Sequence, residues 1–469
     1  MKIALLHYHL KPGGVTTVLR HQVDALKRDC SLLVLSGSPP GSHWPVPCKS
    51  IPGIGYQYDP TLTPDPDKIA QEIQQAIQES WKGGCDLLHV HNPTLAKNRI
   101  FLDVLKVLQV NGIPLLLQIH DFAEDGRPQA YFEDQYPDDC HYSVINSRDY
   151  YLLLNAGLKR KGLHLLPNPV KPFDIDEGLS SGSEDILYPV RAIRRKNIGE
   201  ALLLSLYFKK KQALSITLPP NSPADMTAYK GWKHFSKINK LNIRFEAGLD
   251  NQFEQLVSRA QCLLTTSITE GFGYTFLEAW TAGKLVWGRN LSEITKDFTS
   301  QGLRLDHLYQ QLRVPLTWMD HQLFFTQWKR CLLENSRLYG LGSGDIRVDH
   351  AIDEMQDTGL VDFGQLDEFF QKQILQVLIS APSQKGLLAE INPFLKNPAL
   401  PNNSTDLIRH NRQVILNQFN AAIYRENLLK TYHRVLNSPQ KQHIDKHRLA
   451  ASFLNPETFS LLKWRRYVE

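Results

Sequence analysis

The sequence contains no uninterrupted apolar stretch that approaches the roughly 18 residues needed for a membrane-spanning helix. Its six cysteines are scattered, and none forms a Cys-x-x-Cys pair, which argues against a disulfide framework and favours reduced thiols. The apolar run inside MKIALLHYHLKPGG is too short for a signal peptide and is followed by His, Lys and Pro. We therefore expect a cytoplasmic protein without a transmembrane segment.

A strong charge bias is also absent. The net charge is +5, from 53 basic and 48 acidic residues, and the short basic clusters do not gather into one face. Nucleic-acid-binding domains commonly combine a pI above about 9 with a basic patch, so we predict no nucleic-acid partner. No Gly-x-Gly-x-x-Gly follows any apolar run, which argues against a dinucleotide-dependent dehydrogenase.

Short apolar runs are abundant, and segments of helical length separate them. Near-continuous apolarity is typical of strands buried on both faces, and alternation with helices predicts parallel α/β sheets. The first series of runs is 2–8, 31–37, 86–91, 114–120, 142–147 and 163–169. The second series is 185–191, 213–219, 243–248, 262–267 and 284–288.

Two such series in 469 residues predict two main domains. The Gly-, Ser- and acid-rich segment 171–185 is the expected linker between them. We predict an N-terminal domain over 1–175, a C-terminal domain over 182–436, and a helical tail over 437–469 that packs back on the N-domain. Residues 300–350 are rich in aromatic residues and largely helical in pattern, and we expect them to form an insertion. Residues 407–436 have the pattern of one long amphipathic helix.

Polar and glycine-rich segments follow the strands in both series. Ligands of open α/β sheets bind beyond the carboxyl ends of the strands, so these segments mark the ligand edge of each sheet. Gly13-Gly14 follows the first strand, His120 and Asp121 follow the fourth, and Arg191 and Lys196 follow the first strand of the second series. The expected fold is therefore two Rossmann-like, doubly wound parallel-sheet domains that face a cleft.

Two of these segments suit a phosphorylated ligand. Glycine at positions 13 and 14 lets backbone approach an anion closely at the start of a helix. An arginine at a strand end and a lysine five residues later, Arg191 and Lys196, can clamp a diphosphate and stabilise charge on a leaving group. A plain turn and a solvated basic loop are the competing interpretations.

The strongest motif is Glu270-Gly-Phe-Gly-Tyr-Thr-Phe-Leu-Glu278. Glycines at 271 and 273 permit a tight backbone path, and a helix is expected to begin near Tyr274. One carboxylate can then meet a sugar and the other a ribose, with phosphates at the amides between them. A surface helix with an acidic cap is the alternative.

His89 and His91 share one face of a strand, which could begin a metal site. No set of Cys, His or Asp residues close in the sequence supplies further ligands, so we predict no bound metal. For His120, a buried structural histidine is the competing interpretation.

Together these motifs resemble the family-4 GT-B glycosyltransferases, a group that includes sucrose-phosphate synthases and bacterial mannosyltransferases. The resemblance covers about residues 1–295 and 355–436. Glu270 and Glu278 match the family's paired acids, Arg191 and Lys196 its cationic pair, and His120 its strand-end histidine. Trp280, Arg194-Arg195 and the segment 300–350 depart from the family pattern, and Arg194-Arg195 would add charge beside the diphosphate clamp.

The resemblance implies metal-independent transfer of a hexose from a nucleotide-diphosphate sugar, with retained anomeric configuration and no further cofactor. His120, Glu270, Arg191 and Lys196 would be catalytic. The implied donor-binding set is Gly13, Gly14, Arg191, Lys196, Glu270, Gly271, Phe272, Gly273, Tyr274, Thr275 and Glu278. The departing phosphate would deprotonate the acceptor, so no general-base carboxylate is needed, unlike the two-carboxylate glycosidases.

The acceptor is expected to be a small soluble molecule or saccharide, because no basic amphipathic helix with an aromatic face is evident in the N-domain. Peripheral membrane contact and the oligomeric state stay open. Two alternatives remain: a nucleotide-sugar epimerase of the same architecture, which would convert donor without acceptor, and a non-catalytic nucleotide-sugar-binding protein.

Overall fold

The computed structural model describes residues 1–41, 43–57, 64–173, 185–342, 348–398 and 404–466. Most of the predicted linker 171–185 lies outside these ranges. The chain forms two compact units. The first contains Met1–Pro169 and Phe419–Phe453, and the second contains Val170–Gln418 and Leu454–Glu469.

The first unit is built on a seven-stranded sheet in the order β3-β2-β1-β4-β5-β6-β7. All its strand pairs are parallel, as the apolar runs predict. The strands are β1 Lys2–His7, β2 Ser31–Ser36, β3 Cys48–Ser50, β4 Leu87–His91, β5 Leu115–Ile119, β6 His141–Val144 and β7 Leu163–Leu165. Strand β3 was not predicted, since only half-buried and exposed residues form it. The strand order reverses between β1 and β4, where ligands of such sheets bind.

Helices connect these strands and cover the sheet: α1 Gly14–Leu26, α2 Pro66–Ser80, α3 Phe101–Val110 and α4 Ser147–Asn155. Local sequence explains their starts. Asp65 accepts the amide of Asp67 at the beginning of α2, where Pro66 occupies the first turn, and Asn146 caps α4 in the same way.

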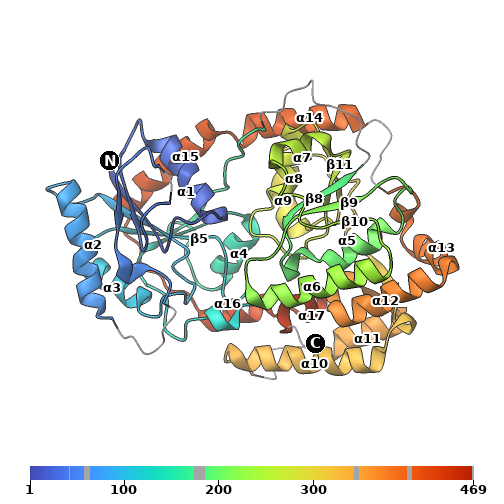
Figure 1. Ribbon diagram of the computed structural model, residues 1–469. Helices are drawn as coiled ribbons and strands as arrows, with labels where there is room; N and C mark the ends of the chain where they lie inside the picture. The colour runs from blue at the N-terminus through green and yellow to red at the C-terminus, as the bar shows by residue number, and fades with distance from the viewer. Residues whose placement is uncertain (42, 58–63, 174–184, 343–347, 399–403, 467–469) are drawn as a thin grey trace. The chain divides into compact units, whose positions relative to one another are not determined.

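A helix from the far end of the chain completes this unit. Helix α15 (Ala421–Asn437) lies against α1, and in Figure 1 its red ribbon runs beside the blue one. Its residues Tyr424, Leu428 and Tyr432 are buried in one core cluster with strands β1 and β2. The predicted C-terminal domain extended without a break to residue 436, whereas Phe419–Phe453 belong to the first unit, because the apolar face of α15 packs there.

The single helix predicted over 407–436 is two helices, α14 (Ser404–Gln418) and α15. The break falls at Asn420, whose extended backbone and side chain cap α15 by accepting the amides of Ala422 and Ile423. The predicted tail 437–469 is also divided: α16 (Lys446–Phe453) belongs to the first unit and α17 (Leu461–Trp464) to the second.

The second unit has a five-stranded parallel sheet in the order β10-β9-β8-β11-β12. Its strands are β8 Ile186–Arg191, β9 Leu214–Leu218, β10 Ile243–Arg244, β11 Cys262–Thr265 and β12 Leu285–Gly288. The connecting helices are α5 Ile198–Ser205, α6 Pro223–Ile238, α7 Phe253–Arg259, α8 Thr275–Thr281 and α9 Ser292–Ser300. The order reverses between β8 and β11, which places the ligand edge of this sheet at their carboxyl ends.

The segment predicted as a helical insertion over 300–350 is helical only in its second half. Residues 301–312 form turns, followed by strand β13 (Arg313–Pro315) and helix α10 (His321–Leu338). Strand β13 pairs antiparallel with β14 (Leu360–Asp362), a pairing between distant segments that no local pattern indicated. Helices α11 Val348–Thr358, α12 Glu368–Ser380 and α13 Pro382–Ile391 follow. No described helix combines the length and the apolarity needed to cross a membrane.

Candidate functional site

Two loops of the second unit meet at the point where its strand order reverses. Lys196 ends the short 3-10 turn Arg194–Lys196 after β8, and Glu270 lies in the loop after β11. The Lys196 ammonium donates to the Glu270 carboxylate in an ion pair whose side chains are 15% and 11% exposed. The structure thus brings together two of the four predicted catalytic residues.

Glu270 is held in its ionised form. Burial opposes ionisation, but the charges of Lys196 and Arg195 outweigh it, so the pKa of Glu270 lies below its ordinary value. The Glu270 carboxylate is therefore negative at neutral pH and can accept hydrogen bonds from a ligand.

Hydrogen bonds fix the backbone that carries Lys196. Tyr188 donates its hydroxyl to the Lys196 carbonyl, and Thr266 donates to the same carbonyl at 3.1 Å and to that of Asn197 at 3.0 Å. Asn197 adopts a left-handed conformation with φ of 52°, which asparagine tolerates better than most residues. The loop after β11 therefore holds the loop after β8 directly.

The neighbouring arginines behave differently from the prediction. Arg191 is exposed, and its guanidinium donates to the Pro219 carbonyl at 3.1 Å, toward the end of β9 rather than toward Glu270. Arg194, expected to add charge beside the diphosphate clamp, instead forms a bidentate pair with the buried Glu368, at 2.6 and 2.7 Å. Arg194 is committed to Glu368 because a buried carboxylate needs a compensating charge. The other member of the expected pair, Arg195, does add positive charge beside Lys196, since it lowers the pKa of Glu270.

The loop from Gly271 to Thr275 leads into α8, which begins one residue after the predicted Tyr274. Gly273 has φ of 86°, a conformation that favours glycine, and its carbonyl accepts the Phe276 amide at 3.0 Å. The backbone itself thus requires the glycine at 273, whatever the loop binds.

Glu278 lies on α8, eight positions after Glu270. Among the described residues, nothing forms a hydrogen bond or ion pair with its carboxylate, and burial raises its pKa to about 7. A half-buried carboxylate without a partner is costly in the protein alone. Trp280, a departure from the family pattern, is fully buried and donates to the Phe276 carbonyl, so it fills the core.

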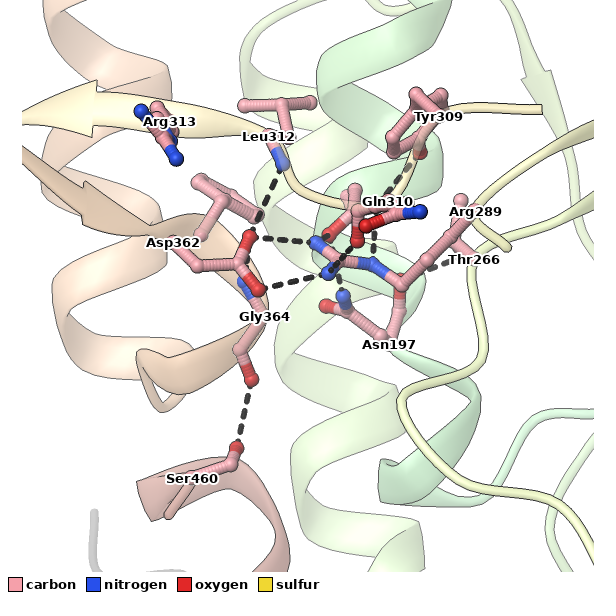
Figure 2. Close-up of polar contacts among 12 residues, drawn as sticks. Asn197, Thr266, Arg289, Tyr309, Gln310, Leu312, Arg313, Asp362, Gly364 and Ser460 are labelled. Carbon is pink, nitrogen blue, oxygen red and sulfur yellow. Dashed lines mark hydrogen bonds and ion pairs between the residues drawn. The ribbon is translucent and has the colours of Figure 1, made fainter. Parts of the chain in front are cut away.

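A buried network behind Lys196 was missed by sequence reasoning. Arg289, only 5% exposed, makes bidentate contacts with Glu200 on α5 and with Asp362 on β14. Glu200 also accepts from Asn197 at 2.7 Å and from Tyr309 at 2.6 Å. In Figure 2, dashed lines join the Arg289 guanidinium to the Asp362 carboxylate. No sequence signal was available, since the partners are far apart in the chain.

In the first unit, Gly13 and Gly14 lie between β1 and α1. A Cβ atom at Gly14 would meet nothing within 4 Å, and one at Gly13 would meet only the Lys11 carbonyl at 3.9 Å. Neither residue has a left-handed φ. The packing of the protein therefore does not demand glycine here.

His120 lies at the carboxyl end of β5, beside the end of β4. Its Nε2 is 2.9 Å from His91 Nδ1, and its amide donates to the Asn92 side chain at 2.7 Å. Burial lowers the pKa of His120 to about 4 and those of His7 and His89 to about 3. His120 is thus neutral near pH 7 and oriented by two neighbours. His89 was considered above as a possible metal ligand, and its Nδ1 lies 3.0 Å from the Tyr432 hydroxyl.

The predicted site residues are thus divided between the two units. Gly13, Gly14 and His120 occupy the edge of the first sheet at β1 and β5, whereas Lys196, Glu270, the loop 271–275 and Glu278 share one edge of the second.

No family model matches the sequence. The chain is similar to mannosylglucosyl-3-phosphoglycerate synthase from Petrotoga mobilis, at 28% identity over 337 residues. The match spans 63% of this chain and 66% of that protein, slightly less than two thirds of its length.

Solved structures resemble the fold. Sucrose-phosphate synthase from Thermosynechococcus elongatus has a TM-score of 0.51 and 14% identity, over 92% of this chain and 98% of that chain. Anabaena HepE in complex with UDP and glucose has a TM-score of 0.51 and 12% identity, over 92% of this chain and 99% of that chain. A glycosyltransferase from Rickettsia africae has a TM-score of 0.54 and 11% identity, over 93% of this chain and 99% of that chain. At these identities the matches show the fold alone, and they confirm the predicted fold class of two parallel-sheet α/β domains.

Proposed function

We propose that this chain, which has the GT-B fold and resembles the family-4 glycosyltransferases, transfers a hexose from a nucleotide-diphosphate sugar to a hydroxyl acceptor. One observation carries the proposal: two carboxylates flank the loop 271–275, and only one of them has a partner within the part of the chain that the structure describes. Glu270 is paired with Lys196 and ionised, whereas Glu278 has no bonding partner among the described residues.

Glu278 has the properties of a ribose ligand. The two vicinal hydroxyls of a ribose can both donate to one carboxylate. They would supply the hydrogen bonds that Glu278 does not receive from the described residues. Binding would then offset the cost of burying the carboxylate and favour its ionised form. The pKa of Glu278, about 7 without ligand, is expected to fall when nucleotide binds.

Lys196 would stabilise the departing nucleoside diphosphate. Opposite charges at about 4 Å attract by on the order of 1–4 kcal/mol between bulk water and an effective dielectric of 20. Glu270 positions the ammonium and presents its own oxygens to hydroxyls of the transferred sugar. Arg191 would join the clamp only after its guanidinium leaves the Pro219 carbonyl.

The first unit would supply His120 and the glycine pair. His120 is neutral, and its contact with His91 holds the imidazole in one orientation for a neutral hydrogen bond to the sugar. The open space at Gly14 lets a phosphate or an acceptor approach the backbone closely.

The reaction proposed is transfer with retention. The bond between the anomeric carbon and the diphosphate oxygen breaks as the acceptor oxygen attacks the same face of the sugar. The acceptor proton passes to the departing phosphate oxygen, so the protein needs to supply positioning and charge stabilisation rather than a general base. Metal independence is part of the same proposal.

The acceptor class is suggested by the relative from Petrotoga mobilis. Its name describes a product built on 3-phosphoglycerate, a small soluble acid. We infer a small soluble acceptor for this chain as well, and glycosylated phosphoglycerates belong in the first panel of acceptors.

The decisive experiment is a nucleotide-release screen of purified protein with UDP-, GDP- and ADP-hexoses, alone and with pooled small acceptors. Acceptor-dependent release of nucleotide, with a product of unchanged anomeric configuration by NMR, is the expected result. Conversion of donor without acceptor would identify an epimerase. Binding of donor without any release would identify a non-catalytic binding protein.

A further inference from the structure

Three loops of the first unit converge beyond the ends of β1, β4 and β5. The residue after β1, Tyr8, donates its hydroxyl to the Leu95 carbonyl at 2.8 Å. Ala96 donates to the Ala130 carbonyl at 2.8 Å, and Gln57 donates to the Lys97 carbonyl at 2.8 Å. These bonds fix the backbone of Lys97 at the edge where the strand order of the first sheet reverses.

The side chain of Lys97 is half-buried but has no carboxylate partner among the described residues. Its ammonium lies 5.9 Å from the centroid of the Tyr56 ring. Burial lowers its pKa, and the nearby Arg127 lowers it further, while Asp121 partly offsets both. By contrast, Lys106, which is also half-buried, contacts Asp103 at 3.2 Å.

Among the described residues, Asp121 is the carboxylate whose charge acts on Lys97, and it is already engaged. Asp121 accepts from the Arg127 guanidinium at 2.9 Å, and both side chains are only about a quarter exposed. The three side chains Lys97, Arg127 and Asp121 therefore carry a net charge of +1. Lys11 adds positive charge to the same edge, because it acts on His9, whose ring packs at 4.9 Å against Tyr56.

We propose that Lys97, with Arg127 beside it, forms a subsite for an anionic group, phosphate or carboxylate, on the acceptor. An ammonium that has lost hydration without gaining a counter-charge is poised to bind an anion. The ion pair of Arg127 with Asp121 fixes the guanidinium, so a bound anion meets one positive group that is already held in place together with the Lys97 ammonium. This inference rests on the proposed transferase function, and it adds that the acceptor is an acid.

Lys97 belongs to the first unit, whereas Lys196 of the proposed donor clamp belongs to the second. It follows that the two sites can be tested independently. A variant at Lys97 should alter the response to the acceptor and leave nucleotide binding unchanged, and a variant at Lys196 should do the reverse.

The test uses the full chain and three probes of similar size: glycerol 3-phosphate, D-glycerate and glycerol. Binding is followed by NMR titration in the presence of a saturating nucleoside diphosphate, which keeps the phosphate probe out of the donor site. Glycerol 3-phosphate or D-glycerate should bind saturably, more weakly at raised salt, and glycerol should not. Which of the two acids binds distinguishes a phosphate group from a carboxylate.

Lys97→Ala should weaken binding of the acid at least tenfold, equivalent to about 1.4 kcal/mol. Lys97→Arg should restore most of it, and the control Lys106→Ala should bind like the wild type. Equal binding of glycerol and the acids, or unchanged binding by Lys97→Ala, would overturn the subsite. Failure of every nucleoside diphosphate to bind would instead count against the proposed function, and the titration would then be repeated without nucleotide.

Discussion

Lys196 and Glu270, which are 74 positions apart in the chain, form a largely buried ion pair. They meet because β8 and β11 are neighbours in the sheet, and each residue lies in the loop that follows its strand. The pair joins a cation suited to a diphosphate with an acid suited to a sugar.

Replacement of Glu270 by alanine should reduce sugar transfer by at least ~10²-fold, the scale of losing one transition-state contact. The reason is twofold: the sugar loses a hydrogen-bond acceptor, and Lys196 loses the group that positions it. Steady-state kinetics with the donor found in the screen would measure this. Glu254→Ala, on the exposed face of α7, is the matched control. Near-normal transfer by Glu270→Ala would refute the assignment.

Glu278→Gln should change stability and nucleotide binding in opposite directions. The pKa of Glu278 is about 7 in the folded protein against an ordinary value of 4.5, so the folded state holds this proton more tightly. Wild-type stability therefore falls as pH rises through this interval, and the glutamine variant, which never ionises, avoids that loss.

Thermal unfolding should consequently show Glu278→Gln to be more stable than the wild type at about pH 8, with the gain vanishing near pH 4.5. The same variant should bind nucleotide more weakly at about pH 8, because a neutral amide accepts fewer hydrogen bonds. Glu293→Gln, an exposed position of α9, is the control. A stability difference that does not depend on pH would contradict the prediction.

Gly14→Ala should leave the protein folded but impair transfer. The added methyl group enters open space, so the melting temperature should stay within a degree or so of the wild type, whereas a ligand close to the backbone would be displaced. Gly288→Ala is the contrasting variant, since its φ of 130° and a Cβ only 1.9 Å from the Thr265 carbonyl oxygen make it strongly destabilising. Full activity of Gly14→Ala would remove Gly14 from the site.

Arg289→Met should lower the free energy of unfolding by about 3–5 kcal/mol, because it leaves Glu200 and Asp362 as uncompensated buried charges. Denaturant titration would measure the loss. The control Arg330→Ala breaks an exposed contact with Glu334 at 3.8 Å and should cost less than about 1 kcal/mol. A cost for Arg289→Met no larger than that of the control would show that the network contributes little.

Local patterns were sufficient for much of the fold. Every predicted strand is present, because a strand buried on both faces requires a continuous apolar run, as in β1 and β5. The rule that ligand groups follow strand ends also indicated the loop of Lys196 and that of Glu270. Both inferences depend on residues that are adjacent in the chain.

Residues that are close together in the chain thus specify the alternation of strands and helices and the chemistry at the strand ends. Tertiary structure alone decided which cation meets which acid: Arg194 pairs with Glu368, Arg289 joins Glu200 to Asp362, and α15 packs on the first unit. The physical reason is that a buried charge must be neutralised by whatever group the packing brings near, and that group can come from any distance along the chain.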